Sequence, residues 1–245
     1  MKKNALVTGG SSGIGRAIVI RLAKEGYRVI TCGRQIDKLI ALKEELKAQG
    51  YTIFPIKTDF RSEESINQLF AKIRKKFGSL DVLINAAAVG YKAPLSSSST
   101  DLWNEMLSVN IIALCICSRE MIKDLNSKKL KGHIVNISSL SGHRIASEAG
   151  IYEATKFSVT VITESLRREL LPTKGRIKVS QISPGLTKSS FHKNYYDSSK
   201  DAESIYSQFQ PLEASNIADA VFYILSQPDN VQINDILLRP VGQVL

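Results

Sequence analysis

The chain of 245 residues is 43% hydrophobic, which is enough for a substantial buried core. No linker rich in Pro, Gly or Ser and no internal repeat divides it, so we expect one domain over residues 1–245. The apolar run Ala5 to Val7 follows the start almost at once and leaves no room for a secretory signal, and no apolar stretch is long enough to cross a bilayer. We therefore expect a cytoplasmic protein without a membrane partner.

The formal net charge is +10, which raises the question of a nucleic-acid partner. The basic clusters at 72–76 and 128–131 fall where helices are expected to end, so the cations complement the helix dipoles. No recognition helix or aromatic-rich strand motif accompanies them, and we predict a solvated surface and no nucleic-acid partner. Cys32, Cys115 and Cys117 lie within expected strand or helix without metal-like neighbours; we interpret them as core thiols and expect no metal site.

Short apolar runs alternate with helical patterns along the chain. We expect strands at Ala5–Val7, Val29–Thr31, Thr52–Ile56, Val82–Ile84, Ile134–Ile137, Ile177–Ile182 and Ile233–Leu238. We expect helices at Ile14–Lys24, Asp37–Gln49, Ser62–Phe77, Leu102–Leu125, Ile151–Leu171 and Ala214–Ser226. This pattern predicts an α/β fold, a doubly wound parallel sheet of seven strands with helices on both faces. Ligands of such sheets bind beyond the carboxyl ends of the strands.

A glycine-rich segment, Thr8 to Gly15, follows the first expected strand and opens the first expected helix. Glycines at such a turn permit positive φ and a close approach of the backbone to a pyrophosphate, whose charge the helix N-terminus favours. We predict that a dinucleotide binds this segment, through the residues Gly9, Ser11, Ser12, Gly13, Ile14 and Gly15.

The same segment also fits the G-x-S-x-G pattern of a hydrolase nucleophile elbow, with Ser11 as the nucleophile. A hydrolase of that type needs an acid and then a histidine later in the chain. The available histidines are His133, His143 and His192, and none falls in the late loop that would carry the base. We favour the dinucleotide site.

The end of the second expected strand indicates which dinucleotide binds. A site for NAD usually has a carboxylate there for the ribose hydroxyls, and the segment Thr31 to Arg34 has none. Arg34 stands next to that position, and a guanidinium binds a dianionic phosphate in a forked geometry. We predict NADP(H) rather than NAD(H); the alternative is a solvent-exposed arginine at a helix start.

Tyr152 and Lys156 are four residues apart in an expected helix, so they share one helix face. An ammonium beside a phenol stabilises the phenolate, and we expect the pKa of Tyr152 to be lowered enough for general acid or base catalysis near neutral pH. Ser139 ends the strand before this helix, where its hydroxyl can bind a substrate oxygen, while Ser138 is interpreted as a structural hydroxyl. Together these residues predict hydride transfer between a nicotinamide and a carbonyl or alcohol.

Taken in order, these motifs resemble those of the short-chain dehydrogenase/reductase family, in its compact single-domain branch, over nearly the whole chain. The resemblance rests on Thr8 to Gly15, Asp59, Asn85-Ala86-Ala87, Asn110, Ser139, Tyr152, Lys156, Pro184-Gly185 and Thr187. It implies a Rossmann fold and a catalytic tetrad of Asn110, Ser139, Tyr152 and Lys156, with Asn110 holding a water that links Lys156 to solvent. The alternative for Asn110 is an asparagine that packs helices.

The resemblance also implies a set of cofactor contacts. Lys156 would bind the nicotinamide ribose, Asp59 the adenine amino group, and Thr187 the nicotinamide amide. The full expected set beyond the glycine-rich segment is Arg34, Asp59, Phe60, Asn85, Ala86, Tyr152, Lys156, Pro184, Gly185 and Thr187. Asp59 could instead be an acid near a helix start, and Thr187 a loop hydroxyl.

One departure from the family pattern is Ala88, where glycine is common, and we expect a slightly altered turn beside the cofactor. The segment 188–211 falls where the family has its variable substrate lid. Its aromatic residues can either pack the lid onto the core or touch substrate, and we interpret His192 as a surface residue of the lid.

Within the family, we rank a general NADP-dependent carbonyl reductase first and a 3-hydroxy-acid dehydrogenase second. A 3-oxoacyl carrier-protein reductase is third, because the usual Val-Asp-Gly-Gly tail is absent. A non-catalytic NADPH-sensing protein is disfavoured, because a pure binding module has no need of a tyrosine beside a lysine. The two long helices are apolar around much of their circumference, and the resemblance implies that they form a homo-oligomer, a dimer or a tetramer.

Overall fold

A computed structural model describes residues 2–145, 150–196, 204, 206–207 and 210–243. The strands are β1 (Asn4–Thr8), β2 (Arg28–Gly33), β3 (Ile53–Lys57), β4 (Val82–Asn85), β5 (Gly132–Ile137), β6 (Ile177–Pro184) and β7 (Asp235–Leu238). The helices are α1 (Gly13–Lys24), α2 (Ile36–Ala48), α3 (Glu63–Phe77), α4 (Thr100–Leu107), α5 (Ala113–Lys128), α6 (Ile151–Glu169), α7 (Ser190–Tyr196) and α9 (Ala214–Leu225).

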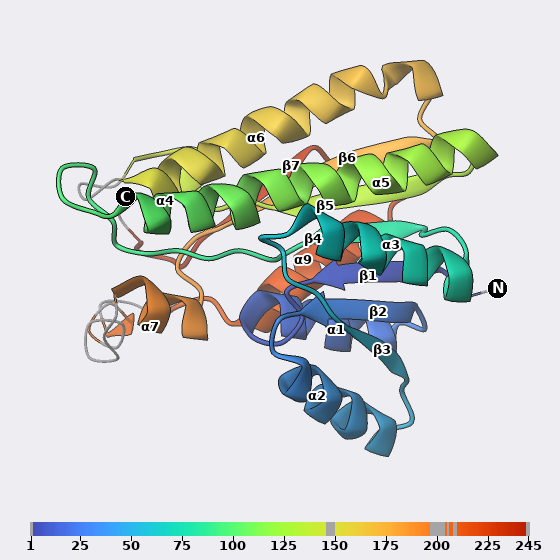
Figure 1. Ribbon diagram of the computed structural model, residues 1–245, viewed down its shortest axis with the longest axis horizontal. Helices are drawn as coiled ribbons and strands as arrows, with labels where there is room; N and C mark the ends of the chain where they lie inside the picture. Colours follow the sequence, from blue (N-terminus) through green and yellow to red (C-terminus); the bar gives the residue numbers. More distant parts are fainter. Residues whose placement is uncertain (1, 146–149, 197–203, 205, 208–209, 244–245) are drawn as a thin grey trace.

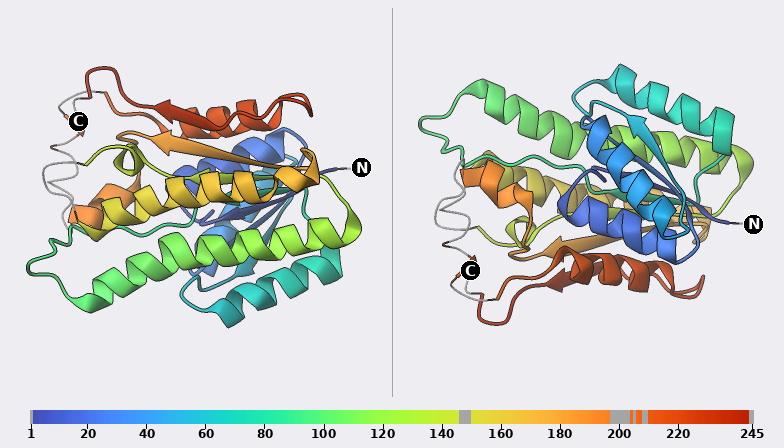
Figure 2. Two further views of the ribbon diagram at one scale, coloured as in Figure 1. Left: turned by 90° about the horizontal axis from the view of Figure 1, so that it is seen from above. Right: turned by 90° about the horizontal axis from the view of Figure 1, so that it is seen from below.

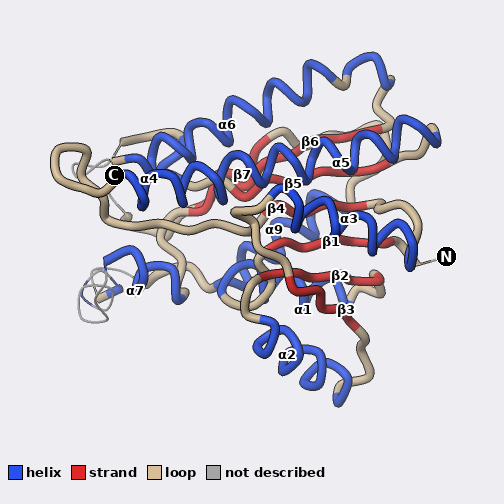
Figure 3. Tube along the Cα trace, in the orientation of Figure 1, coloured by secondary structure: helices blue, strands red, loops and turns tan. Residues whose placement is uncertain are grey.

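The strands form one parallel sheet in the order β3-β2-β1-β4-β5-β6-β7 (Figure 1). The order reverses direction between β1 and β4, which is the switch point where doubly wound sheets bind their ligands. The predicted fold, a doubly wound Rossmann sheet, is confirmed. The carboxyl ends of the strands and the loops that follow them lie at one edge of the sheet, near α7 (Figure 3).

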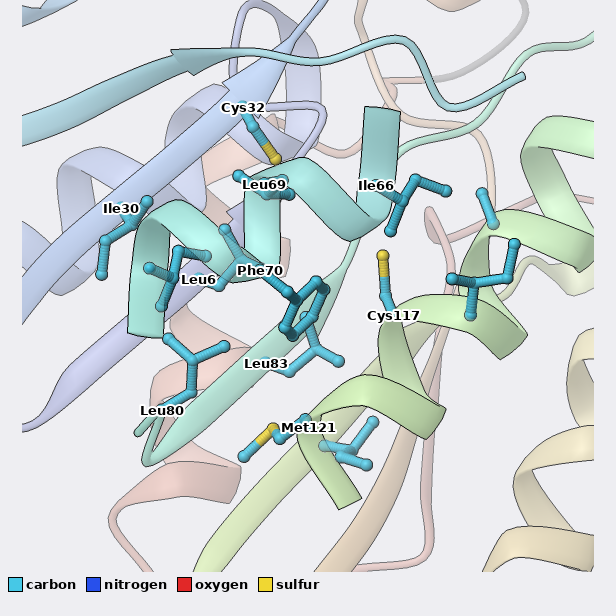
Figure 4. Close-up of a cluster of buried hydrophobic side chains, with 14 of the residues drawn as sticks. Leu6, Ile30, Cys32, Ile66, Leu69, Phe70, Leu80, Leu83, Cys117 and Met121 are labelled. Atoms are coloured by element: carbon cyan, nitrogen blue, oxygen red, sulfur yellow. The ribbon is translucent and has the colours of Figure 1, made fainter. Parts of the chain in front are cut away.

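Helices cover both faces of the sheet (Figure 2). On one face α3, α5 and α6 pack over a core that includes Phe70 and Met121, and Figure 4 shows that cluster. On the other face α1, α2 and α9 pack over a second core that includes Ile18 and Val221. Burial on both sides explains why the central strands are continuous runs of apolar residues.

The expected helix Leu102–Leu125 is longer than predicted and interrupted. It begins at Thr100, ends at Lys128 and passes through a π-helical turn at Ser108–Ile112. Such turns are rare and often mark functional sites. The pattern of apolar residues in the sequence does not reveal the turn.

The cysteines and basic clusters lie where the sequence indicates. Cys32 and Cys117 are buried and Cys115 is half-buried, and all three are free thiols. Residues 74–76 form the last turn of α3, and Lys128 ends α5. Among the helices of the described residues, none combines the length and the apolar character that a bilayer-spanning segment requires.

His133 is buried in the middle of the sheet. It lies in β5 and is 6% exposed, and its Nε2 shares a hydrogen bond of 2.8 Å with the Ser180 hydroxyl of β6. Burial, together with the charges of Lys178 and Lys3, lowers the pKa of His133 to about 3. The folded protein therefore holds this imidazole in its neutral form.

We predict that His133 makes the folded state sensitive to acid. Its folded pKa lies below the ordinary value of 6.5, so its stabilising contribution is full above pH 6.5 and is lost as the pH falls toward 3. Within that window it should contribute up to about 1.4 kcal/mol per pH unit to the fall in the free energy of unfolding. Urea denaturation between pH 7 and 5 measures this slope. The variant His133→Gln should have a shallower slope, and an unchanged slope would contradict the assignment.

Candidate active site

A cavity of about 930 Å³ opens at the carboxyl edge of the sheet. Its lining contains nearly the whole predicted set, namely Gly9, Ser11, Ser12, Gly13, Ile14, Gly15, Arg34, Asp59, Phe60, Ala86, Ser139, Tyr152, Lys156, Pro184, Gly185 and Thr187. Asn85 and Asn110 are the predicted residues that do not line it. Residues from six different connections thus meet in one place because parallel strands end at the same edge.

The glycine-rich segment forms a tight turn at one end of the cavity. Gly9 has a φ of +72° and its backbone N–H donates to the Cys32 carbonyl at 2.9 Å. A Cβ on Gly9 would lie 2.8 Å from the Cα of Ala87, so only glycine lets these two loops touch. A Cβ on Gly15 would overlap the Gly9 carbonyl. The segment is thus shaped by backbone contacts that a larger residue would break.

The turn after β4 is joined to this segment by Thr8. The Thr8 hydroxyl accepts hydrogen bonds from the backbone N–H groups of Ala86 and Ala87, both at 3.0 Å. Along 86–88, which the structure describes throughout, the alanines all have negative φ. Ala88 therefore needs no conformation that glycine alone adopts, and the altered turn that we expected stays a prediction.

The start of α1 is suited to a phosphate group. The N-cap Ser12 makes no hydrogen bond with its side chain, and Gly13 next to it has a φ of +51°. The first N–H groups of a helix have no partners within the helix and attract anions. The absence of side chains at Gly9 and Gly13 leaves room for a ligand to approach the backbone. The residues present fit a dinucleotide pyrophosphate.

A group of charged residues follows β2 and β3 at the cavity wall. Arg34 follows β2, is 45% exposed and pairs with Glu105 of α4 at 3.1 Å. Asp59 follows β3 and makes a forked pair with Arg61, with distances of 2.6 to 3.1 Å. The hydrogen bonds from Arg61 lower the pKa of Asp59 despite some burial. Both Arg34 and Asp59 line the cavity, as predicted, but each already has an ionic partner in the chain.

Asn85 lies away from the cavity. It is 4% exposed, and its amide donates to Asn136 at 2.9 Å and to Ser118 at 3.2 Å. Asn136 in turn donates to Thr163 of α6 at 2.9 Å. This chain of hydrogen bonds links β4, β5, α5 and α6 inside the protein. The side chain of Asn85 therefore supports the sheet, and the predicted direct contact with the cofactor is not supported by its position.

Asn110 lies in the π-helical turn and is 2% exposed. Its amide donates to the Val89 carbonyl at 2.8 Å and to the Thr155 hydroxyl at 3.0 Å, and its oxygen accepts from the Val89 N–H at 2.9 Å. Thr155 also donates to the carbonyl of Tyr152 at 2.7 Å. The Asn110 side chain is thus fully engaged in positioning the turn at Val89 and the start of α6. Both amide hydrogens are used in these bonds, and the Asn110 oxygen accepts one hydrogen bond, so the water that we expected Asn110 to hold stays a prediction.

Ser139, Tyr152 and Lys156 meet at the centre of the cavity wall. Ser139 follows β5 and caps a short 3-10 turn, its hydroxyl accepting from the Ser141 N–H at 3.1 Å. Tyr152 and Lys156 lie on α6, and the Lys156 ammonium sits 5.8 Å from the centre of the Tyr152 ring. Lys156 donates to the Ile137 carbonyl at 3.1 Å. The predicted grouping of these three side chains is present.

Ser138 has a different role from its neighbour. Its hydroxyl donates to the Lys156 carbonyl at 3.1 Å and shares a contact of 3.4 Å with the Thr160 hydroxyl. Ser138 is 4% exposed. These bonds tie the end of β5 to α6, in agreement with its interpretation as a structural hydroxyl.

The pKa of Tyr152 differs from the prediction. Burial raises the pKa well above its ordinary value and outweighs the hydrogen bond with Ser139, which acts in the opposite direction. Burial also lowers the pKa of Lys156 to about 8. The prediction treated the pair as if it stood in water, whereas loss of hydration in this pocket outweighs the attraction between the two groups. The chain by itself keeps Tyr152 protonated at neutral pH.

The loop after β6 is held by a residue that the sequence did not reveal. The side-chain oxygen of Gln243 accepts a hydrogen bond from the Leu186 N–H at 3.0 Å, and a Cβ on Gly185 would overlap that oxygen. Thr187 donates to the Gly185 carbonyl at 3.0 Å. Gln243 comes from the tail of the chain, where no periodic pattern points to a role. Only the packed fold shows that it shapes this wall.

The described part of the expected lid contains α7, which packs over the catalytic side chains. The ring centre of Phe191 lies 5.2 Å from that of Tyr152, and the ring centre of Tyr195 lies 5.6 Å from it. Phe191 fits because the neighbouring residue is Gly90, where a Cβ would overlap the Phe191 ring. These aromatic residues line the cavity and also pack against the core. Residues 197–203, 205 and 208–209 of the expected lid lie outside the described residues.

His192 is more buried than we expected for a surface residue of the lid. It is half-buried, and a ring nitrogen shares a hydrogen bond of 2.9 Å with the Tyr206 hydroxyl. Burial lowers the pKa of His192 to about 4. His143 bonds to Ser183 at 2.8 Å and lies 3.1 Å from Asp235. With His133 bonded to Ser180, each histidine has a partner other than Ser11, which argues against the hydrolase alternative.

The cavity therefore joins a glycine-rich turn to a buried tyrosine, a buried lysine and a half-buried serine. A family model for short chain dehydrogenase matches residues 3–200. The chain therefore belongs to the short-chain dehydrogenase family.

Similar proteins support this assignment over the full length. Dehydrogenase/reductase SDR family member 11 of Bos taurus is 39% identical over 246 residues, which cover 98% of this chain and 96% of that protein. Farnesol dehydrogenase of Aedes aegypti is 36% identical, with 98% of this chain and 97% of that protein covered. The closed form of serine dehydrogenase complexed with NADP+ has a TM-score of 0.92 at 28% identity, over 99% of this chain and 96% of that one.

We predict that Gly15→Ala disrupts the glycine-rich turn. Its added methyl group would meet backbone rather than a mobile side chain, so the turn must open, and we expect at least a tenfold loss of dinucleotide affinity together with a lower melting temperature. Calorimetric titration and thermal unfolding measure the two effects. The matched variant Gly33→Ala, whose Cβ meets nothing nearer than 3.8 Å, should keep its melting temperature. Wild-type affinity in Gly15→Ala would contradict the described turn.

Proposed function

We propose that this protein is an NADP(H)-dependent oxidoreductase that transfers hydride between the nicotinamide and a carbonyl or secondary alcohol, with Tyr152 as the proton donor or acceptor. The observation that carries the proposal is the single cavity that joins a phosphate cradle at Gly9 to Gly15 with Ser139, Tyr152 and Lys156. The oxidoreductase family to which the chain belongs supports the same reaction class. When bound, the nicotinamide supplies or accepts the hydride, and its positive oxidised form favours the Tyr152 phenolate.

Two side chains of the protein, Tyr152 and Ser139, interact with the substrate oxygen in the proposed mechanism. In the direction of reduction, Tyr152 donates its proton to that oxygen and the Ser139 hydroxyl donates a hydrogen bond to it. The raised pKa of Tyr152 suits a proton donor, because the phenol stays protonated until it is needed. Lys156 has a pKa of about 8 and can return a proton toward Tyr152, whereas Asn110 positions α6 through Thr155.

NADP(H) is the proposed cofactor because of Arg34. Its guanidinium lies at the cavity wall after β2, where a 2′-phosphate can bind in a forked geometry. Several similar structures are NADP complexes, including serine dehydrogenase and a metagenomic short-chain oxidoreductase. Asp59 would take the adenine end and Thr187 the nicotinamide amide.

The substrate side of the cavity is apolar and aromatic, and we propose a substrate with an apolar body. Tyr91, Leu140, Leu186, Phe191 and Tyr195 line this side. Burial of apolar substrate surface against such walls is favourable, whereas a small polar substrate would leave them in contact with water. The name of the similar mosquito protein, farnesol dehydrogenase, fits an alcohol as substrate.

A 3-hydroxy acid is the second candidate, and one residue favours it. Arg144 is exposed and lines the cavity beyond Ser139, where its guanidinium could bind a carboxylate. Serine dehydrogenase, whose structure is so similar, bears a name that fits this class. We rank it below the apolar carbonyl because Arg144 is the only lining residue of the described substrate side that offers a positive charge besides Lys156.

We further propose that the protein self-associates through α4, α5 and α6. Ile112, in the π-helical turn between α4 and α5, is 54% exposed, and Val161 on α6 is 64% exposed. A second cavity between α5 and α6 is lined by Ile122, Ile162 and Leu166. Exposed apolar area of this kind is typical of subunit contacts.

Sedimentation equilibrium at micromolar concentration should give the mass of a dimer or tetramer, and a mass of 27.0 kDa would contradict self-association. We propose the cytoplasm as the location of the protein, because its reducing conditions keep thiols such as the three free cysteines reduced.

The proton donor can be tested with a set of hydroxyl variants. Tyr152→Phe removes only the proton donor, and we expect kcat to fall about 10²- to 10⁴-fold in an assay of NADPH oxidation over a panel of ketones, diketones and 3-oxo esters. Ser139→Ala should also lower kcat, by about 10²-fold or more. The neighbouring variant Ser138→Ala is the matched control and should retain kcat within a few fold. Turnover near wild type in Tyr152→Phe would contradict the mechanism.

The cofactor assignment predicts a change of preference on charge reversal at Arg34. In Arg34→Asp the side chain repels a 2′-phosphate and can instead accept hydrogen bonds from ribose hydroxyls. We expect the ratio of kcat/KM for NADPH to that for NADH to fall by at least a hundredfold. Steady-state kinetics with both cofactors give this ratio. A variant that still strongly favours NADPH would show that Arg34 does not bind the phosphate.

A further inference from the structure

Glu105 contacts two residues that line the active-site cavity, Arg34 and Tyr91. It sits on α4 with 21% of its side chain exposed. One carboxylate oxygen accepts from the Arg34 guanidinium at 3.1 Å and lies 3.9 Å from the Arg61 guanidinium. The other oxygen accepts from the Tyr91 hydroxyl at 2.8 Å. A single carboxylate therefore contacts both Arg34, which is proposed to bind the phosphate, and Tyr91, a residue of the substrate wall.

The charges around Arg34 are balanced before any phosphate arrives. Arg61 is engaged by Asp59 through a forked pair, so its charge is largely neutralised. Arg34 is paired with Glu105. Two cations thus face two carboxylates, and an incoming 2′-phosphate adds two further negative charges. The phosphate must displace Glu105 from Arg34 or share the guanidinium with it, and either arrangement weakens phosphate binding.

Glu105 has reason to stay nearby after it loses Arg34. The hydrogen bond from Tyr91 holds its second oxygen, and Arg61 remains within reach of its first. Tyr91 lines the cavity and is half-buried, so it is held by its own packing. The carboxylate is therefore fixed beside the phosphate position rather than free to swing into solvent.

We propose that Glu105 is the resident counter-ion of Arg34 and sets how strongly the protein prefers a 2′-phosphorylated dinucleotide over an unphosphorylated one. This inference rests on the proposed function, because it assumes that Arg34 binds the phosphate. An unphosphorylated ribose leaves the Arg34–Glu105 pair intact. A 2′-phosphate competes with that pair, so Glu105 lowers affinity for the phosphorylated ligand alone. The protein's preference for NADP(H) is consequently weaker than Arg34 by itself would produce.

The test uses the isolated adenosine ends of the two cofactors. Adenosine 2′,5′-bisphosphate and 5′-AMP are titrated by calorimetry into the wild type, Glu105→Gln, Arg34→Ala and the double variant. We expect Glu105→Gln to bind the bisphosphate about three- to tenfold more tightly, in the range expected for loss of a partly exposed ion pair and of one neighbouring negative charge. Binding of 5′-AMP should change less than twofold. The gain should shrink as salt rises, because these groups are partly exposed.

Controls separate competition from a general effect of charge. Asp101→Asn removes one negative charge from the same helix, one turn earlier, and should alter bisphosphate binding less than twofold. In the Arg34→Ala background, Glu105→Gln should produce at most a small gain, because the pair no longer exists. A gain of equal size in both backgrounds would overturn the counter-ion role.

The remaining outcomes distinguish a failure of the role proposed for Glu105 from a failure of the role proposed for Arg34. If Arg34→Ala weakens binding of the bisphosphate and Glu105→Gln leaves it unchanged or weakens it, Arg34 binds the phosphate and the inference about Glu105 is wrong. In that case Glu105 orients Arg34 rather than competing for it. If Arg34→Ala leaves the discrimination between the two ligands intact, the proposed cofactor assignment fails, and the inference fails with it.

Discussion

The proposed chemistry of this protein depends on the exclusion of water around Tyr152 and Lys156. The two side chains lie one helical turn apart on α6, and Lys156 replaces part of its lost hydration with one hydrogen bond to the Ile137 carbonyl. α7 covers Tyr152 with two aromatic rings. Burial disfavours the charged form of both groups, so the Tyr152 phenol becomes a weaker acid and the Lys156 ammonium becomes a stronger acid. A Lys156 ammonium can therefore return a proton to a Tyr152 phenolate, as the proposed proton transfer at the substrate oxygen requires.

This pocket is supported by polar side chains that do not touch it. Asn110 fixes both the turn at Val89 and the first turn of α6, and the bonds from Asn85 through Asn136 to Thr163 join the sheet to the same helix. Buried amides of this kind have every donor directed to a partner, which restricts the positions that the helix can take. The π-helical turn at Ser108–Ile112 brings Asn110 to this junction. Support of this sort holds Tyr152 and Ser139 at a fixed separation.

The sequence predicts the fold and most of the cavity lining because both depend on local patterns. Alternating strands and helices define the sheet, and residues after each strand, such as Arg34 and Ser139, must reach its carboxyl edge. Three features depend on packing between distant segments and could not be predicted in this way. The pKa of Tyr152 reflects how much water α7 and the β4 loop exclude. Asn85 and Asn110 turn inward because partners from other elements face them. Gln243 reaches Leu186 from the far end of the chain.

The central claim is that burial by the chain raises the pKa of Tyr152, and that the positive oxidised nicotinamide lowers it into the working range. The most direct measurement is an NMR titration of the protein with ¹³Cζ-labelled tyrosine, with Tyr152 assigned through Tyr152→Phe, in the absence and in the presence of NADP+. The account predicts a pKa above the ordinary value of 10.0 for the protein alone and a fall of at least about one unit when the nucleotide is added. A pKa below 10.0 without nucleotide, or one that does not change on binding, would contradict it.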